Sequence, residues 1–587
     1  MTPRHHAPQA ENQPDPVQVA TGYHQRTKHH PHRFAASLGY LDWESQPDPF
    51  RRYKDAPLIS LPLSPAVTED LSAALYDDLF TPDVLPVQPL NAERLSSFLY
   101  NSLALSAWKS ASGNRWPLRV NPSSGNLHPT EGWLAMPAVH GLTESPAILH
   151  YTPREHALEQ RLLLDEDTWH ALIRGLPPGA FLVALSSVPW RESWKYGERA
   201  YRYCQHDVGH ALAALRLAAA QQGWKLTMLP TSDKLLNNLL GLDRDDGFLP
   251  EEPEHADLLA AVFPASTPFP ADAVGSWQVD EAAIESSLRV ATWSGRPNAL
   301  SPDHQPWEIV EVAGSVCERT KAPRDWWQHE APAQLDPTAG PLPPLHDLAP
   351  SAPSAPSAPS SSALASHTIR GRRSAVSMDG HTELGLADFH RMLARTVPAL
   401  CPVPWDAWPH KPAVHLGLFV HRVTGLTPGL YALVRDKSSQ DALRTSMHDS
   451  FRWERPEGTP DALGLYMLTA ADARRPSSSI SCNQDIAGDG AFSLGMLAAF
   501  DKTLQDRGAP GYRELFWETG MIGQVLYLEA EASGLRATGI GCFFDDSVHG
   551  AFGIADTSWQ SLYHFTVGGP EEDERITTLP AYPAPRD

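Results

Sequence analysis

The sequence predicts an α+β protein of two similar domains, each with helices packed on a small, mostly antiparallel sheet. The first observation is a helical passage that occurs twice: Tyr201-Arg202, Gly209, Ala219 and Gly223, and then Tyr512-Arg513, Gly520, Ala530 and Gly534. Each position of the second copy lies 311 residues after its counterpart, and Gly241-Leu242 recurs as Gly553-Ile554 with one residue slipped. Solenoid repeats are only about 20–50 residues long, so this period indicates a duplicated and fused domain.

Chain length and a low-complexity stretch set the domain bounds. A chain of 587 residues predicts two or three domains, and 42% apolar residues suffice for their cores. Pro341–Ser362 contains three consecutive Ser-Ala-Pro triplets, which are typical of a semi-extended linker. We therefore expect disorder over 1–20, a first domain over 21–280 that includes a His- and aromatic-rich extension, an irregular connection over 281–335, a linker over 336–365, and a second domain over 366–587.

The apolar pattern predicts matching elements in the two copies. In the first copy we expect a helix at Glu93–Trp108, strands at Trp133–Val139 and Phe181–Val188, and a helix at Tyr201–Gln222 that ends at Gly223. In the second copy we expect a helix at Leu386–Leu393, strands at Val414–Val420 and Leu463–Leu468, a helix at Tyr512–Ser533, and a strand at Tyr563–Val567.

Composition excludes several classes of protein. A net charge of -22 argues against a nucleic-acid groove or an anionic membrane as partner. The polar start has no apolar core of a signal peptide, and no run of about 18 apolar residues predicts a membrane span. The five cysteines are scattered and form no CxxC pair, which is typical of reduced thiols in a cytoplasmic protein.

Two segments could bind an oxygen-rich or phosphorylated ligand. Asn121–Pro129 combines turn residues with hydroxyls, an amide and exposed backbone N–H groups, although the same composition suits a plain turn. Arg370-Gly371-Arg372-Arg373-Ser374 clusters forked donors before a helix, as phosphate sites do, although a solvated basic run would look alike.

A third segment could carry acid–base chemistry. Lys195-Tyr196 lies in an aromatic setting that could lower the pKa of a lysine, and the alternative is a surface lysine beside a packing tyrosine. His29-His30 and His32 lack a second cluster at metal spacing, so we predict no metal site. Thr538-Gly539-Ile540-Gly541 is shorter than a dinucleotide fingerprint, no phosphate-binding P-loop is present, and Asp545-Asp546 is most simply a helix N-cap.

Together these segments resemble the nitroreductase superfamily of flavin enzymes, in particular its azoline-dehydrogenase-like branch. Arg372-Arg373-Ser374 resembles the family's grip on FMN phosphate and ribityl. Pro122-Ser123-Ser124-Gly125-Asn126-Leu127-His128-Pro129 resembles the loop that borders the isoalloxazine, with His128 where the family usually has Gln. The features of the branch are Tyr23-His24, Thr27-Lys28-His29, Leu41-Asp42-Trp43, Gln46-Pro47-Asp48-Pro49-Phe50 and Lys195-Tyr196.

The resemblance implies an intrachain pseudo-dimer with one FMN. Family members are dimers whose flavin sites draw on both subunits. Here the first domain keeps the loop at Pro122, Ser123, Ser124, Asn126 and His128, and the second keeps Arg372, Arg373 and Ser374. Their counterparts are missing at Asp77–Pro89 and Val397–Pro412, so one site remains. Gly539, Ile540 and Gly541 are expected near the flavin edge, and Arg575 in the place of a late phosphate-binding residue.

The function implied is an FMN-dependent oxidoreductase of a small molecule or peptide, in particular an azoline-type dehydrogenase in which Lys195 or Tyr196 takes the substrate proton. One alternative is an NAD(P)H-dependent reductase of nitroaromatics or quinones. The other is a flavin-binding scaffold in a peptide-modification complex. Retention of Lys195-Tyr196 favours an enzyme, and failure of both NAD(P)H and azoline to reduce the flavin would favour the scaffold.

Overall fold

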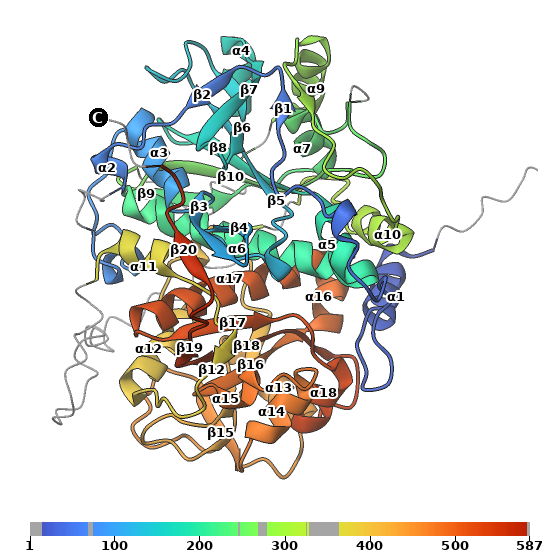
Figure 1. Cartoon of the computed structure of the whole chain (residues 1–587), viewed down its shortest axis with the longest axis vertical. Coiled ribbons are helices and arrows are strands. Elements are labelled where there is room, and N and C mark those ends of the chain that lie inside the picture. The colour runs from blue at the N-terminus through green and yellow to red at the C-terminus, as the bar shows by residue number, and fades with distance from the viewer. Residues whose placement is uncertain are drawn as a thin grey trace, which may run out of the picture.

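The computed structural model describes residues 14–68, 74–244, 247–267, 277, 279–323, 326–327 and 363–583. The predicted Ser-Ala-Pro linker lies almost wholly outside this part of the chain. Figure 1 shows two α+β domains stacked on each other, the first in blue to green and the second in yellow to red. The predicted fold class is confirmed. Within the described ranges, no helix is long and apolar enough to cross a membrane.

The first domain is built on a seven-stranded sheet in which every neighbouring pair is antiparallel. Its order is β2-β7-β6-β5-β8-β10-β9. The strands are β2 (Leu58–Ser60), β5 (Thr130–Met136), β6 (Ala147–Thr152), β7 (Ala157–Leu163), β8 (Phe181–Ser187), β9 (Trp224–Met228) and β10 (His255–Pro264).

The second domain repeats this topology in a six-stranded antiparallel sheet of order β15-β14-β13-β16-β18-β17. Its strands are β13 (Val414–Val420), β14 (Gly429–Leu433), β15 (Leu465–Ala470), β16 (Phe492–Ala499), β17 (Arg536–Ile540) and β18 (Trp559–Gly568). Strand for strand, this order matches β7-β6-β5-β8-β10-β9 of the first domain. In both sheets, the strand that comes last in the sequence lies between the two strands that precede it. The shared topology supports the interpretation that one domain was duplicated.

Helices cover the sheets and fill the space between them. The first domain contributes α1 (Pro16–Arg26), α2 (Pro65–Thr68), α3 (Ala92–Tyr100), α4 (Glu166–Leu172), α5 (Pro189–Tyr196), α6 (Ala200–Gln221), α7 (Asp233–Leu240), α9 (Glu281–Val290) and α10 (Glu308–Val316). The second contributes α11 (Ala365–Gly371), α12 (Leu386–Arg395), α13 (Gln440–Ser446), α14 (Arg474–Ile480), α15 (Ile486–Asp489), α16 (Phe500–Arg507), α17 (Pro510–Ala532) and α18 (Asp545–Phe552).

The long helices α6 and α17 cross at the centre of the molecule (Figure 1). Both are buried almost all round, as expected for helices rich in Ala, Leu and aromatic residues. At the crossing, a Cβ on Gly209 would overlap the carbonyl oxygen of Trp517, and a Cβ on Gly520 would overlap that of His206. These four positions correspond in pairs across the repeat, so the contact has the reciprocal form of a two-fold dimer interface.

Each domain also extends an arm over the other. His29 of the N-terminal extension pairs in parallel with Phe544 of the second domain. At the other end of the chain, β20 (Thr577–Leu579) adds a strand to the hairpin of β3 (Leu105–Ala111) and β4 (Asn114–Arg119). The remaining strands form two short pairs: β1 (Tyr53–Lys54) with β11 (Arg296–Pro297), and β12 (Ser377–Met378) with β19 (Pro570–Glu571).

Four local expectations are corrected by the structure. Residues 16–20 are not disordered but begin α1, because Asp15 caps it and Ala20 is buried in the core. The segment 281–335 is not irregular throughout, since α9 and α10 bury apolar residues at helical spacing. The helix expected over 93–108 ends at Tyr100, before β3 begins. Asp545 lies in the first turn of α18, and Phe544 holds the cap position.

Candidate functional site

A cavity of about 650 Å³ lies between the two domains. Its walls include eleven residues singled out from the sequence as cofactor-binding, together with Tyr196: Pro122, Ser123, Ser124, Asn126, His128, Arg372, Arg373, Ser374, Gly539, Ile540 and Gly541. Lys195 and Arg575 are not among the lining residues. Arg575 has a side chain that is 87% exposed and pairs with Asp573. Segments from both domains therefore meet in one cavity, whereas the late arginine stays at the surface.

The loop from the first domain is held in a strained conformation by its own side chains. Asn126 and His128 have left-handed φ angles of 61° and 56°, which non-glycine residues seldom adopt. The Asn126 amide donates to the Pro117 carbonyl at 2.9 Å, and the Ser123 hydroxyl accepts from the His128 N–H at 2.7 Å. Most of the polar groups expected to face a ligand therefore fix the loop. The Nδ1 atom of His128 is an exception, with no hydrogen-bond partner among the described residues.

Asp207 on α6 holds the same loop by hydrogen bonds. Its carboxylate accepts from the Ser124 N–H at 3.0 Å and from the Ser124 hydroxyl at 3.1 Å. Burial raises the pKa of Asp207 to about 7 despite these hydrogen bonds. Glu192 on α5 is fully buried, and neither of its carboxylate oxygens has a hydrogen-bond partner in the described part of the chain. Burial first, and then the nearby Asp207, raises the pKa of Glu192 well above its usual value. The sequence pointed to neither acid.

Four cations, Lys109, Arg372, Arg373 and Arg536, gather at one end of the cavity, which we call the cationic end. Three acids, Glu571, Glu572 and Asp573, also line the cavity, and Arg536 pairs with Glu531. Burial, and then the positive charge of Arg372, lowers the pKa of Arg373 to about 10. The pKa of Lys109 is also lowered, by burial and by Arg373. Such mutual repulsion is relieved when an anion binds between the cations. Lys109 and Arg536 come from β3 and β17, and nothing near them in sequence marked them.

Arg372 has two donors without an acceptor among the described residues, and Arg536 has one. The Arg372 guanidinium lies 5.0 Å from the centroid of the Tyr527 ring, and Nη2 donates to the Arg119 carbonyl at 3.2 Å. Its Nε and Nη1 atoms are buried and find no acceptor within the described residues. Arg373 instead donates to the carbonyls of Arg370 and Arg372, both at 2.7 Å. Of these two neighbouring arginines, Arg372 therefore keeps unpaired donors next to the cavity that it lines.

The other end of the cavity is flat and aromatic. Added Cβ atoms on Gly539 and Gly541 would overlap the rings of Tyr563 and Tyr203, so only glycine allows these contacts. The Tyr203 hydroxyl donates to the Gly541 carbonyl at 3.1 Å, which fixes the strand against the ring. Backbone and ring surfaces together form a wall suited to a planar ligand.

Tyr196 lines the cavity, whereas Lys195 does not. The Tyr196 hydroxyl touches Gly125, whose φ of 58° and missing side chain make the contact possible. Burial, and then the carboxyl of Glu192, raises the pKa of Tyr196 well above its usual value, so the phenol stays protonated. The Lys195 ammonium lies 5.2 Å from the centroid of the Tyr196 ring. Tyr196 can therefore donate a hydrogen bond into the cavity, with Lys195 behind it.

The position that corresponds to this cavity in the other half of the repeat, which we call the second position, contains only about 20 Å³ of space. Arg216, which lies 311 residues before Tyr527, occupies this position and binds Asp406 at 2.7 Å. The segment Thr81–Leu85 replaces Arg372–Val376 in the wall. The sequence predicts that the second phosphate-binding segment is missing, and at that position the structure leaves only a small space.

Tryptophans occupy the flat end of the second position. The Trp327 indole donates to the carbonyl of Met228, which is the last residue of β9 as Ile540 is of β17. Next to it, the Arg319 guanidinium lies 4.9 Å from the ring centroid of Trp326 and 5.2 Å from that of Trp517. Arg319, Trp326 and Trp327 come from the segment between the two domains, so the connection itself packs over the second position.

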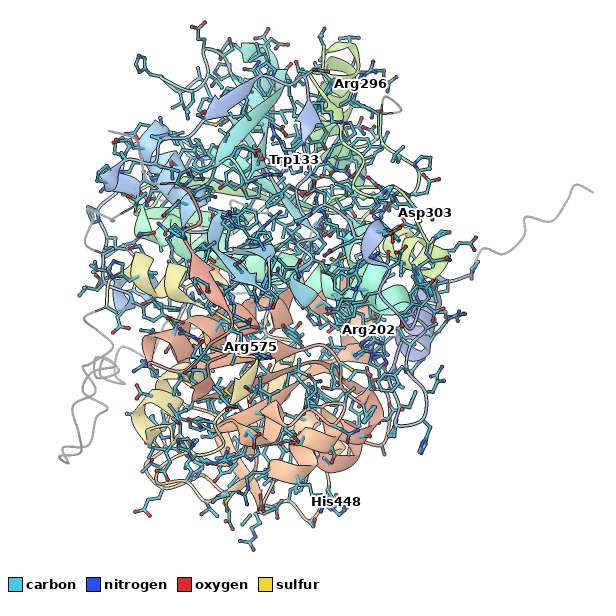
Figure 2. All side chains as sticks on the ribbon, in the orientation of Figure 1. Trp133, Arg202, Arg296, Asp303, His448 and Arg575 are labelled. Carbon is cyan, nitrogen blue, oxygen red and sulfur yellow. The ribbon has the colours of Figure 1, made fainter. Side chains whose placement is uncertain are left out.

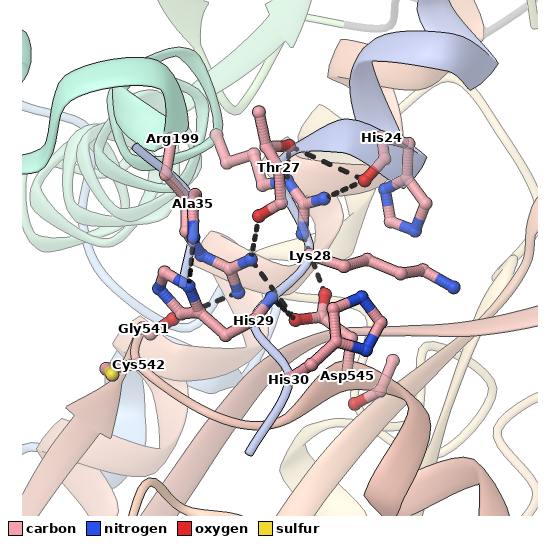
Figure 3. A network of polar contacts seen from close by, with 12 residues as sticks. His24, Thr27, Lys28, His29, His30, Ala35, Arg199, Gly541, Cys542 and Asp545 are labelled. Atoms are coloured by element: carbon pink, nitrogen blue, oxygen red, sulfur yellow. Dashed lines mark hydrogen bonds and ion pairs between the residues drawn. The ribbon is translucent and has the colours of Figure 1, made fainter. Parts of the chain in front are cut away.

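Buried ion pairs hold the domains around the cavity. In Figure 3, the Asp545 carboxylate lies beside Arg199 and the extension that carries Thr27 and His29. It accepts from Arg199 at 3.2 Å and from Arg202 at 2.9 Å. Figure 2 shows Arg202 where the two domains meet. Arg199 also donates to the Gly541 carbonyl at 3.2 Å, so this network positions one edge of the cavity.

Comparison with known proteins agrees with this architecture. Residues 403–569 match the model of the nitroreductase family. A solved nitroreductase-like protein from Anabaena variabilis is similar over 94% of this chain and 99% of its own, with 21% identity and a TM-score of 0.62. The chain has the nitroreductase fold. The Anabaena structure shows that fold for the two-domain chain as a whole.

Two further structures match a smaller part of the chain. A nitroreductase-like protein from Ralstonia eutropha covers 40% of this chain and is itself covered to 98%, with 15% identity and a TM-score of 0.23. A chain of the E. coli microcin synthetase McbBCD complex with truncated pro-MccB17 covers 43% and is covered to 93%, with 18% identity and a TM-score of 0.24. No curated protein matches the sequence.

Proposed function

We propose that this protein is an FMN-dependent oxidoreductase with a single flavin site between its two nitroreductase-like domains. The observation that carries the proposal is one cavity whose wall joins the Pro122–His128 loop of the first domain to Arg372, Arg373 and Ser374 of the second. In that wall, two Arg372 donors find no acceptor among the described residues. Burying charged donors without acceptors is costly, so a site of this kind is built for an anionic ligand.

The residues present fit FMN. Arg372, with Lys109 and Arg536 beside it, would hold the phosphate, and the Ser374 hydroxyl, 3.0 Å from that of Tyr527, would bind the ribityl chain. Gly539, Ile540, Gly541 and the Pro122–His128 loop would border the ring. A bound FMN would supply the two-electron redox chemistry, and the protein supplies orientation, charge and proton handling.

Proton handling falls to Tyr196 and the groups behind it. A phenol that stays protonated donates a hydrogen bond to a substrate atom and passes a proton onward when a base stands nearby. Lys195 lies against the Tyr196 ring, and Glu192 interacts electrostatically with both residues. Dehydrogenation of an azoline ring releases one acidic proton, which would pass through Tyr196 to a group that can be deprotonated near neutral pH. Asp207, with a pKa of about 7, interacts electrostatically with Tyr196 and is such a group. We therefore favour an azoline-type substrate over a nitroaromatic.

One experiment separates this proposal from its two alternatives. The FMN-loaded protein is mixed without oxygen with an azoline-containing peptide or with NADPH, and the flavin absorbance is followed. Bleaching by the azoline peptide, lost in K195A while FMN stays bound, supports the dehydrogenase. Bleaching by NADPH alone points to a nitro or quinone reductase, and bleaching by neither points to a flavin-binding scaffold.

A further inference from the structure

Two of the five cysteines meet at the edge of the cavity. Cys542 directly follows Gly541 and lines the cavity, and its Sγ atom lies 2.7 Å from that of Cys482. Cys482 sits in the turn between α14 and α15 with a left-handed φ of 55°, followed by Asn483 at 58°. Both cysteines are half-buried, whereas Cys204, Cys317 and Cys401 are fully buried. Because 60 residues separate the pair, its spacing in sequence gave no sign of it.

The surroundings make the two thiols unequal. The Ala35 N–H donates to Nδ1 of His29 at 2.9 Å, so the ring proton sits on Nε2 and is left for the Cys542 sulfur. The contact with Cys482, and then the His29 ring and the Arg199 charge, lower the pKa of Cys542. The pKa of Cys482 is raised instead, by the same contact with Cys542 and by burial. Figure 3 shows Cys542 beside Gly541, His29 and Arg199. Cys542 is thus the nucleophile, and Cys482 the second thiol within reach.

We propose that Cys482 and Cys542 form a redox-active pair, oxidised reversibly to a disulfide by exchange with a low-molecular-weight disulfide. The Cys542 thiolate attacks one sulfur of the small disulfide, breaks its S–S bond and releases one thiolate. Cys482 then attacks the Cys542 sulfur of the mixed disulfide and releases the second. The protein loses two electrons and two protons, which leave with the two molecules of small thiol.

The pair has a direct consequence for the cavity. The Gln484 amide already bridges the two segments, donating to the Cys542 carbonyl at 3.0 Å and to the Ser481 carbonyl at 2.8 Å. A disulfide would make this link covalent and fix the backbone next to Gly539–Gly541. This inference requires no bound flavin, so it stands or falls separately from the proposed function.

The test uses the full-length reduced protein with glutathione disulfide as probe and intact mass with peptide mapping as readout. The wild-type chain should lose two hydrogens, form a Cys482–Cys542 cross-link, and recover both thiols with dithiothreitol. C482S should instead accumulate one glutathione on Cys542, because no second thiol resolves the mixed disulfide. C542S should react at least about tenfold more slowly, since an ordinary thiol is only a few per cent thiolate at neutral pH.

Three results would overturn the proposal. The first is wild-type protein that keeps glutathione on Cys542 and never forms the cross-link. The second is C542S reacting as fast as C482S. The third is modification confined to Cys204, Cys317 or Cys401. Alkylation of those three buried cysteines only after denaturant is added shows that the fold is intact in each variant.

Discussion

Arg202 on α6 donates to the Asp545 carboxylate on α18 across the domain interface, at 2.9 Å. The repeat makes the same contact in the opposite direction, since Arg513 on α17 donates to Asp233 on α7 at 2.6 Å. Arg513 lies 311 residues after Arg202, and Asp545 lies 312 after Asp233. A reciprocal exchange of this kind is the signature of a two-fold dimer, so the fused chain preserves an interface that two separate subunits could have formed.

Breaking one of these pairs should destabilise the whole chain. D545N leaves Arg199 and Arg202 buried without their carboxylate, and removing one partner of a buried ion pair costs about 3–5 kcal/mol. Urea denaturation of the purified variant measures this loss. The matched control is D472N, whose exposed pair with Arg474 should contribute little to stability because solvent and salt screen it. Equal stability of D545N and D472N would refute a supporting role for the interface network.

The phosphate grip should depend on Arg372 and not on Arg575. R372A removes charged hydrogen bonds worth about 1.5–3 kcal/mol, so FMN affinity should fall tenfold or more. R575A removes an exposed guanidinium paired with Asp573 and should leave the affinity unchanged. Fluorescence titration of the apoproteins with FMN gives both constants. Should R575A lose as much affinity as R372A, the assignment of the cationic end would be wrong.

Tyr196 and Lys195 should affect turnover and not binding. Y196F removes a protonated hydroxyl at the cavity wall and should slow flavin reduction by substrate about 10²–10⁴-fold, the range of general acid–base groups. K195A should abolish reduction. In both variants the flavin content and spectrum should match the wild type, because neither side chain contacts the cationic end. If K195A allowed the substrate to reduce the flavin at the wild-type single-turnover rate, Lys195 would have only a structural role.

A buried histidine gives the stability a defined pH dependence. His150 lies between Glu159 at 2.9 Å and Glu131 at 3.2 Å, and these hydrogen bonds outweigh burial and raise its pKa to about 9. A raised pKa means that the folded state holds the proton more tightly than the unfolded state. The stabilisation, at most about 3 kcal/mol, is fully present below pH 6.5 and lost as the pH rises through about 9.

The change H150Q isolates that contribution. Glutamine can still donate through its amide N–H groups, and it carries no proton that titrates in this range. Urea unfolding at several values between pH 6.5 and 9.5 should show a declining free energy for the wild type and a shallower decline for H150Q. Parallel curves would mean that His150 is neutral in the folded protein.

Elements with strong local patterns were predictable from the sequence. Val414–Val420 is β13 as predicted, and the helix predicted over Tyr512–Ser533 is α17, since continuous apolar character fixes both. The loop at Pro122 and the arginines at 372–373 carried recognisable local motifs, and both line the cavity. That they bind FMN remains a prediction.

The rest depends on contacts between distant segments. Lys109 and Arg536 are ordinary strand residues until β3 and β17 bring them to one end of the cavity. The sequence does not distinguish Glu192 from other helix acids, and only packing shows that it is buried with no hydrogen-bond partner among the described residues. The pair Trp326-Trp327 was visible in the sequence, but its role in closing the second position requires Trp517 and Met228 beside it.

The central claim is that one flavin site remains and its twin is closed. The measurement that tests it most directly is the ratio of released FMN to protein chain after saturation with FMN and removal of the excess. A cavity of about 650 Å³ at one position, against about 20 Å³ at the other, predicts a ratio near one, and R372A should lower it toward zero. A reproducible ratio near two, or a ratio near one that R372A leaves unchanged, would contradict it.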